Sequence, residues 1–131
     1  MAEQALFEVR TSKSIEEVDK ALREAAARHR FGVLGVQDLQ QLLEEKGQQL
    51  SIQCRVYEVC NPQQAKAVLE RNPAFSSMLP CRVSLYESGG KLTVSTVLPS
   101  GLSQLIPGTG MDDIVADVQH SMRAIVEEAA Q

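Results

Sequence analysis

The chain has 131 residues, of which 44% are hydrophobic and 23% are charged, and its formal net charge is −4. This length is that of one domain, large enough to bury a core without disulfides or a metal ion, so we expect a single domain over residues 1–131. The acidic balance and the lack of a basic patch argue against nucleic acid and acidic membranes as partners. No signal-type N-terminus and no apolar run long enough to span a bilayer occurs, which predicts a cytoplasmic protein. The three cysteines are therefore expected to be free thiols.

The N-terminal part predicts a strand followed by a helix. Residues 6–10 alternate apolar and polar side chains, as a half-buried strand does. Ser14 and Glu17 have the spacing of a capping box, in which a hydroxyl and a carboxylate each bind an unpaired amide at a helix start. We therefore expect a helix that begins near Ile15 and ends by Gly32.

A second strand and a second helix are expected next. Residues 31–36 have the pattern of a short strand, and Asp38 can cap the helix that follows it. Gly47 can end this helix in the left-handed conformation. The helix is expected to direct its leucines inward, namely Leu39, Leu42 and Leu43.

The middle of the chain predicts a strand over residues 51–60 and then a third helix. Asn61 can cap this helix, and Pro62 can occupy its first position. The two-residue period of the strand sets Ile52, Cys54 and Val56 against Gln53, Arg55 and Tyr57.

The C-terminal half predicts a hairpin and a long helix. Residues 81–86 and 92–97 alternate and are joined by a turn that contains glycines, which is typical of antiparallel strands. Residues 99–110 are rich in Pro, Gly and Ser and are expected to be irregular. Glu127 and Glu128 oppose the dipole near the end of the last helix and predict fraying there. The wide apolar stripe of this helix consists of Met111, Ile114, Val115, Val118, Met122, Ile125, Val126 and Ala129. Together the elements predict an α+β domain, in which an antiparallel or mixed sheet is covered by helices.

Two short motifs lie about twenty residues apart, Cys60-Asn61-Pro62 and Leu79-Pro80-Cys81. With Phe31-Gly32-Val33-Leu34 before them, they resemble domain-of-unknown-function family 302, a family of small prokaryotic proteins, and the likeness covers nearly the whole chain. The resemblance implies a curved antiparallel sheet with helices on one side, similar to the TATA-binding-protein-like architecture, and a homodimer. It implies no activity, and the acidic chain lacks the basic sheet face that DNA binding would need. Cys54 departs from the family pattern and is expected to be a buried strand residue.

Cys60 and Cys81 form the candidate thiol site, with Glu58, Asn61 and Pro62 as its neighbours. Cys60 directly precedes the predicted third helix, where unpaired amides and the helix dipole favour a thiolate. The alternative is that Cys60 is a small apolar residue of the core, as free cysteines often are. Glu58 has the strand parity of Cys60, so its carboxylate either faces inward beside the thiol or lies at an exposed edge.

The path of the chain between the two strands decides whether the two thiols meet. Cys81 has the strand parity of Val83 and Leu85, which predicts that it faces the core. If its strand begins beside the end of strand 51–60, the thiols are neighbours and can form a redox pair or, with Met78 nearby, a soft-metal site. If its strand begins at the opposite end, the thiols lie a strand length apart.

Other chemistry in the sequence is sparse. His29 and His120 lack the spacing of metal ligands. No nucleophile, base and orienting residue can be assembled, so we expect no catalytic residue, no metal and no cofactor, and a binding protein rather than an enzyme. The favoured hypothesis, supported by the stripe on the last helix, is a non-catalytic homodimer that binds a small ligand or a partner protein. The alternatives are a thiol-dependent redox or sulfur-handling protein and a soft-metal binder, each using Cys60 with Cys81.

Overall fold

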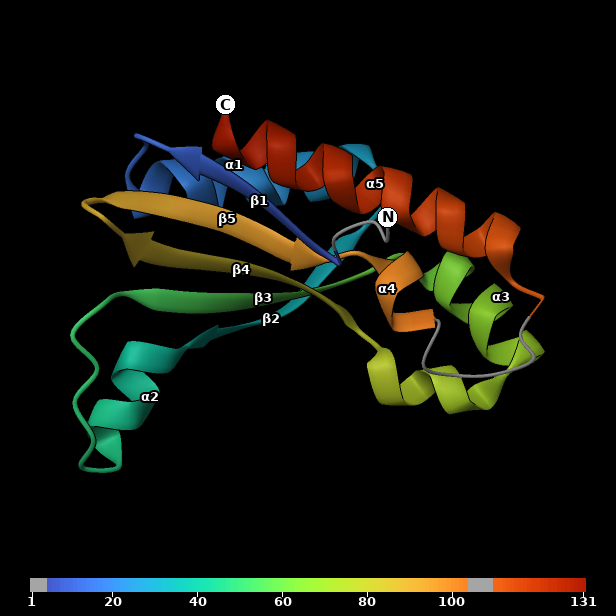
Figure 1. Cartoon of the computed structure of the whole chain (residues 1–131), viewed down its shortest axis with the longest axis horizontal. Coiled ribbons are helices and arrows are strands. Elements are labelled where there is room, and N and C mark those ends of the chain that lie inside the picture. The colour runs from blue at the N-terminus through green and yellow to red at the C-terminus, as the bar shows by residue number, and fades with distance from the viewer. Residues whose placement is uncertain (1–4, 104–109) are drawn as a thin grey trace.

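The structure, a computed structural model, describes residues 5–103 and 110–131. Its sheet has five strands in the order β1-β5-β4-β3-β2, and all neighbouring strands are antiparallel (Figure 1). The strands are β1 (Leu6–Thr11), β2 (Gly32–Asp38), β3 (Cys54–Cys60), β4 (Cys81–Ser88) and β5 (Lys91–Val97). The helices are α1 (Ile15–Arg28), α2 (Leu39–Glu45), α3 (Pro62–Arg71), the 3-10 helix η1 (Pro73–Met78), α4 (Pro99–Ser103) and α5 (Asp112–Ala130). The predicted α+β class is confirmed, with the antiparallel form of the sheet.

Side-chain caps begin three of the helices where the sequence predicts them. The Ser14 hydroxyl accepts a hydrogen bond from the Glu17 amide, and the Glu17 carboxylate accepts one from the Ser14 amide. Asp38 and Asn61 each accept a hydrogen bond from the amide three residues further on. Because Asn61 caps α3, Cys60 lies directly before this helix.

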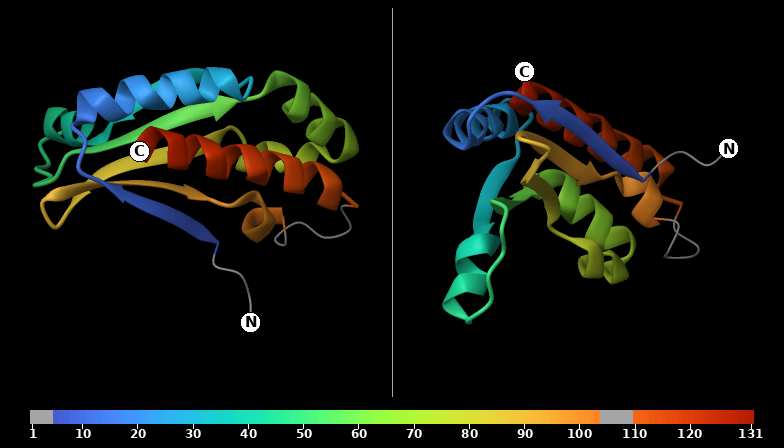
Figure 2. Two further views of the ribbon diagram at one scale, coloured as in Figure 1. Left: turned by 90° about the horizontal axis from the view of Figure 1, so that it is seen from above. Right: turned by 60° about the vertical axis from the view of Figure 1, so that its left-hand side comes forward.

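One face of the sheet is covered by α1 and α5, which lie side by side and contact each other (Figure 2). Beneath them the central strands bury alternate residues, Tyr57 and Val59 of β3 and Val83 and Leu85 of β4. The phenol of Tyr57 donates a hydrogen bond to Asp19 Oδ2 at 2.7 Å, so the polar atom of this buried residue has a partner. The apolar stripe of α5 faces the same core, through Met122, Ile125, Val126 and Ala129.

The other face of the sheet, which we call the open face, is turned away from α1 and α5. Because Tyr57 and Val59 take the helix side of β3, Cys54 and Val56 project to the open face. Cys54 is half-buried there, so the prediction that it is buried is wrong. The sequence does not reveal this choice, since both sets of alternate residues on β3 include apolar side chains.

Helix α2 lies apart from the core. It projects beyond the ends of β2 and β3, on the side away from α5 (Figures 1 and 2). Its leucines are not buried as predicted, and Leu42 is 39% exposed, because no second layer lies against the helix. Gly47, with a φ of 80°, follows the helix end as predicted.

The predicted hairpin of β4 and β5 is paired along only part of its length. Pairing begins at the turn and stops at Ser84, which lies opposite Ser95. However, β4 begins earlier, at Cys81, and β5 continues to Val97. Beyond the last pair, β5 stays with β1 and β4 stays with β3, and β4 bends away from β5 toward η1 (Figure 1). The sheet is therefore split at this end.

Candidate functional site

The split between β4 and β5 opens into a cavity of about 380 Å³. Its apolar walls come from elements far apart in the sequence, with Phe75 and Met78 from η1, Leu102 from α4 and Val115 from α5. Helix α4 can lie close to β1 because Gly101 has no side chain, and a Cβ there would come within 2.7 Å of the Ala5 Cβ. The cavity thus lies between the separated ends of β4 and β5, and residues of η1, α4 and α5 complete its walls.

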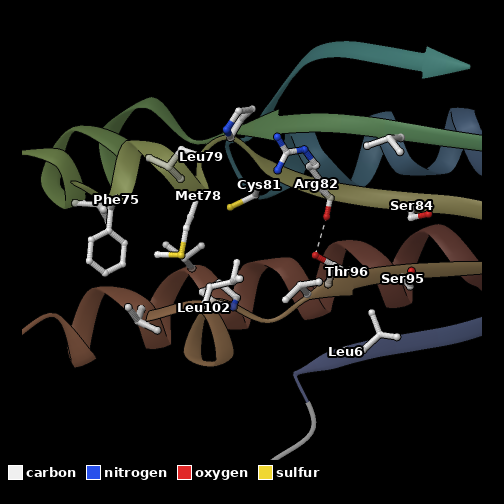
Figure 3. A pocket seen from close by; sticks show the side chains of 17 residues that line it. Leu6, Phe75, Met78, Leu79, Cys81, Arg82, Ser84, Ser95, Thr96 and Leu102 are labelled. Atoms are coloured by element: carbon white, nitrogen blue, oxygen red, sulfur yellow. Dashed lines mark hydrogen bonds between the residues drawn. The ribbon is translucent and has the colours of Figure 1, made fainter. Parts of the chain in front are cut away.

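The polar part of the lining comes from the two split strands. Arg82 and Ser84 belong to β4, and Ser95 and Thr96 belong to β5. Figure 3 shows the serines at one end of the cavity and the η1 side chains at the other. The cavity therefore has an apolar end and a more polar end.

One hydrogen bond joins the strands where their pairing has stopped. The Thr96 hydroxyl donates to the carbonyl oxygen of Arg82 at 2.8 Å, as the dashed line in Figure 3 marks. Thr96 is 4% exposed, and a buried hydroxyl without a partner would be costly. This bond satisfies the hydroxyl and ties β4 to β5 at the cavity wall.

Cys81 contributes its sulfur to the wall of the cavity (Figure 3). It also packs against the main core, in agreement with its strand parity. Burial raises the pKa of the Cys81 thiol to about 11, and the nearby Cys60 adds to the rise. A thiol with this pKa is protonated at neutral pH, so Cys81 behaves as an apolar wall residue and not as a nucleophile.

Cys60 and Cys81 are neighbours and do not lie a strand length apart. Strand β4 begins beside the end of β3, with Cys81 opposite Val59 and Cys60 one residue further along. Both cysteines line a second cavity of about 30 Å³ near the start of α3, and both are free thiols. However, successive strand residues project to opposite faces, so neighbouring positions alone do not give the geometry that a disulfide needs.

The start of α3 offers fewer free amides beside Cys60 than the sequence suggests. Asn61 accepts the hydrogen bond from the Gln64 amide at 3.1 Å, and Pro62, which has no amide hydrogen, occupies the first turn. One of the donors at the helix start is therefore bound by a carboxamide and another is missing. The geometry favours a packing role for Cys60.

Glu58 lies half-buried on the open face, opposite Arg82 in the register of β3 and β4. Its carboxylate lies on the β2 side, because a Cβ placed on Gly35 would come within 3.3 Å of Glu58 Oε1. Within residues 5–103 and 110–131, Glu58 forms no ion pair with Arg82. The carboxylate is therefore directed away from the cavity and from the helix-covered core.

The described residues provide neither a metal cluster nor a membrane-spanning helix. Across these two ranges, no group of three or more His, Cys, Asp or Glu side chains is arranged to hold a metal ion. In the same part of the chain, no helix combines the length and the apolar character that crossing a bilayer requires.

The cavity was not predicted from the sequence, although a signal for it exists. The sequence motifs directed attention to Cys60 and Cys81, of which Cys81 does line the cavity. The available signal was a group of apolar residues, Phe75, Met78 and Leu79. They lie between the predicted third helix and the next predicted strand and belong to the apolar face of neither. Such side chains either fold onto the core or line a pocket, and the sequence alone does not distinguish the two.

The comparisons with known proteins agree with this architecture. A family model described as "Domain of unknown function DUF302" matches residues 7–129. The chain belongs to this family. A crystal structure of an uncharacterized conserved DUF302 protein from Bacillus stearothermophilus has a TM-score of 0.92 and 27% sequence identity, and the match covers 98% of this chain and 100% of that one. No curated protein matches. The resemblance drawn from the motifs is thus confirmed, and DUF302 membership brings a fold without an activity.

Proposed function

We propose that this DUF302 chain binds a small, largely apolar molecule in the cavity between β4 and β5. The observation that carries the proposal is the cavity itself, whose volume of about 380 Å³ lies within the range of ligand sites, roughly 300–1,000 Å³. Its lining is mostly apolar with a few polar groups, which is the usual composition of a small-molecule site. The driving force is the removal of apolar surface from water.

Each part of the lining has a role in this proposal. Phe75 and Leu102 provide rigid apolar contact surface, and Met78, which is flexible and polarizable, adapts to the shape of the bound molecule. The protonated thiol of Cys81 adds a further apolar contact. Binding at this cavity requires no reaction of the lining residues.

Fluorescence titration with the neutral probe N-phenyl-1-naphthylamine tests this proposal. We expect saturable binding by the wild-type protein and at least a tenfold loss in affinity for Leu102→Trp, because the larger side chain occupies part of the cavity. Leu42→Trp on α2 is the matched control, since this leucine is remote from the cavity and already exposed. Thermal unfolding of both variants checks that they are folded. Wild-type protein that does not bind the probe, or equal affinities for the two variants, would contradict the proposal.

We also propose that two copies associate through β2. The apolar stripe of α5 packs within the chain, so it no longer supports a homodimer. In contrast, β2 is an edge strand of seven residues without Lys, Arg or Pro, the residues that commonly protect an edge from pairing. Leu34 is the extra residue of an irregularity between Val33 and Gly35, and it is 65% exposed. Antiparallel pairing of two β2 strands about a two-fold axis would cover Leu34 in both copies.

Sedimentation velocity at micromolar concentration tests the dimer. We expect a dimer for the wild-type protein and a monomer for Leu34→Lys, because two charges would then meet at the interface. Leu6→Lys on β1, the opposite edge strand, serves as the control and should remain dimeric. A wild-type monomer throughout the concentration range would refute the association.

A further inference from the structure

The polar side chains of the cavity lining are gathered on β4 and β5, beside the apolar Leu6, Val56 and Val97 of the same part of the sheet. The side chains from η1, α4 and α5 are apolar, whereas the polar ones, Arg82, Ser84, Ser95 and Thr96, all come from β4 and β5. In Figure 3, Phe75 and Met78 lie at one end and Ser84, Ser95 and Leu6 at the other, and the Arg82 side chain extends from β4 toward β3, on the opposite side from its carbonyl group at the split. A molecule that is polar at one end only would satisfy this division in a single orientation.

Arg82 gives the polar side a charge. Among the described residues that line the cavity, Arg82 is the one that is charged. Its side chain is exposed at the rim, so it can turn toward a bound molecule without unfolding any element. A guanidinium has a planar arrangement of donors that matches a carboxylate, and the interaction is strengthened next to apolar walls that exclude water.

The carboxylates that share the open face with Arg82 are both directed elsewhere. Glu58, opposite Arg82, holds a carboxylate oxygen over Gly35 of β2. Glu8 of β1 accepts a hydrogen bond from the hydroxyl of Tyr86 at 2.5 Å. In the described part of the chain, no carboxylate forms an ion pair with Arg82. The positive charge at the rim is therefore available to a ligand.

We infer that the ligand of this cavity is an amphipathic carboxylate, with its anionic head at Arg82 and its hydrocarbon part directed toward Phe75 and Met78. The inference rests on the proposed function and adds the chemical class of the ligand. The hydrocarbon part supplies affinity through burial of apolar surface, and the head supplies the choice of acid over neutral or cationic molecules of the same length.

Competition with N-phenyl-1-naphthylamine tests the inference, with octanoate, 1-octanol and octylamine as competitors of equal chain length. For the wild-type protein we expect octanoate to compete at least tenfold more strongly than 1-octanol, and octylamine to compete most weakly. Arg82→Gln should weaken octanoate about tenfold and leave 1-octanol unchanged. Glu58→Gln should strengthen octanoate by about two- to threefold, because it removes a negative charge near the head group.

Arg10→Gln is the matched control for Arg82→Gln. Arg10 also belongs to the exposed part of the sheet, but its guanidinium donates to the carbonyl oxygen of Ser88 at 2.6 Å, near the turn between β4 and β5. This variant should bind octanoate like the wild type. If 1-octanol competes as well as octanoate, or if both arginine variants weaken octanoate equally, the carboxylate assignment is wrong although the cavity still binds ligands. If the probe itself does not bind, the proposed function fails first.

Discussion

The two faces of the sheet use the same strands for different purposes. On the helix-covered face, Tyr57, Val83 and Leu85 are buried under α1 and α5. On the open face, the residues next to them in sequence are polar or half-buried, as Ser84 and Tyr86 are. The cavity lies where this separation fails, because it is lined both by Ser84 of the open face and by side chains of α5. The candidate site therefore depends on the incomplete pairing of β4 with β5, and not on either face alone.

Neighbouring residues of β4 provide the strongest test of the comparison. Leu85→Ala should lower the free energy of unfolding by about 2–5 kcal/mol, since it removes a fully buried side chain. Ser84→Ala, on the open face, should change it by no more than about 0.5 kcal/mol. Urea denaturation of the two variants measures both values. Losses of similar size would contradict the assignment of the two faces.

The reactivities of Cys81, which packs against the core, and of Cys54, on the open face, also test the difference between the two faces of the sheet. With the pKa of Cys81 raised to about 11 by burial, about one molecule in a thousand carries this thiolate at pH 8, compared with about one in four for a free thiol near 8.5. Alkylation of Cys81 in the native protein should therefore be at least a hundredfold slower than in the urea-unfolded chain. Mass spectrometry over a range of pH measures the rate, with half-buried Cys54 as the internal comparison. Fast alkylation of native Cys81 at neutral pH would restore the redox hypothesis.

Local rules explain how much of the fold can be predicted from the sequence. The caps at Ser14, Asp38 and Asn61 follow from side chains within three residues of the amides that they bind, and all three were predicted. Strand periods were predicted for the same reason. The buried face of β3 was not predicted, because both sets of its alternate residues include apolar side chains and the choice depends on packing against the distant helices α1 and α5.

The candidate site was harder to predict because no short segment of the sequence determines it. The cavity exists because the pairing of β4 with β5 stops after Ser84, which is a property of long-range register. Likewise, the proximity of Cys60 and Cys81 depends on the return path through α3 and η1, for which both outcomes had been open. The Leu79-Pro80-Cys81 motif contains three of the wall residues, and the structure supplied the rest.

The hydrogen bond under the helices offers a smaller test. Tyr57→Phe should lower the free energy of unfolding by about 1–2 kcal/mol, because it removes the hydrogen bond to the Asp19 carboxylate. Burial alone would raise the pKa of Asp19, but the hydrogen bonds from Tyr57 and Arg23 lower it below its usual value. This stabilisation is present above the unfolded pKa, near 3.9, and is lost as the pH falls through the folded value. Urea denaturation between pH 6 and pH 2 should show a smaller acid loss in the variant, and parallel curves would contradict the assignment.

The smallest expected change in the free energy of unfolding comes from the exposed contacts between the ends of α1 and α5. Glu128 of α5 accepts hydrogen bonds from Arg28 at 2.7 Å and from His29 at 2.8 Å, so the predicted fraying near this residue is wrong. The hydrogen bonds from His29 and then from Arg28 lower the pKa of Glu128. Glu128→Gln should cost less than about 1 kcal/mol at pH 7, as exposed ion pairs do. The difference from the wild type should vanish as the pH falls through the folded pKa, and thermal unfolding at pH 7 and pH 3 measures it. A larger loss of the free energy of unfolding would mean that the Glu128 hydrogen bonds stabilise the packing of α1 and α5 more than exposed ion pairs usually do.

The hydrogen bond between Thr96 and Arg82 also has a consequence for rates. Where a continuous sheet would have to unpair a strand to admit a molecule, this wall is joined by one side-chain bond, which contributes about 1 kcal/mol. Rotation of the Thr96 side chain breaks this bond and leaves the backbone pairs of the sheet intact. The wall should therefore open on the time scale of side-chain and loop motion, nanoseconds to microseconds, instead of the milliseconds or longer that local unfolding requires. NMR line shapes of the Thr96 methyl group during a titration would report the exchange of the ligand, whose residence time would then be set by its affinity and not by the opening of the cavity wall.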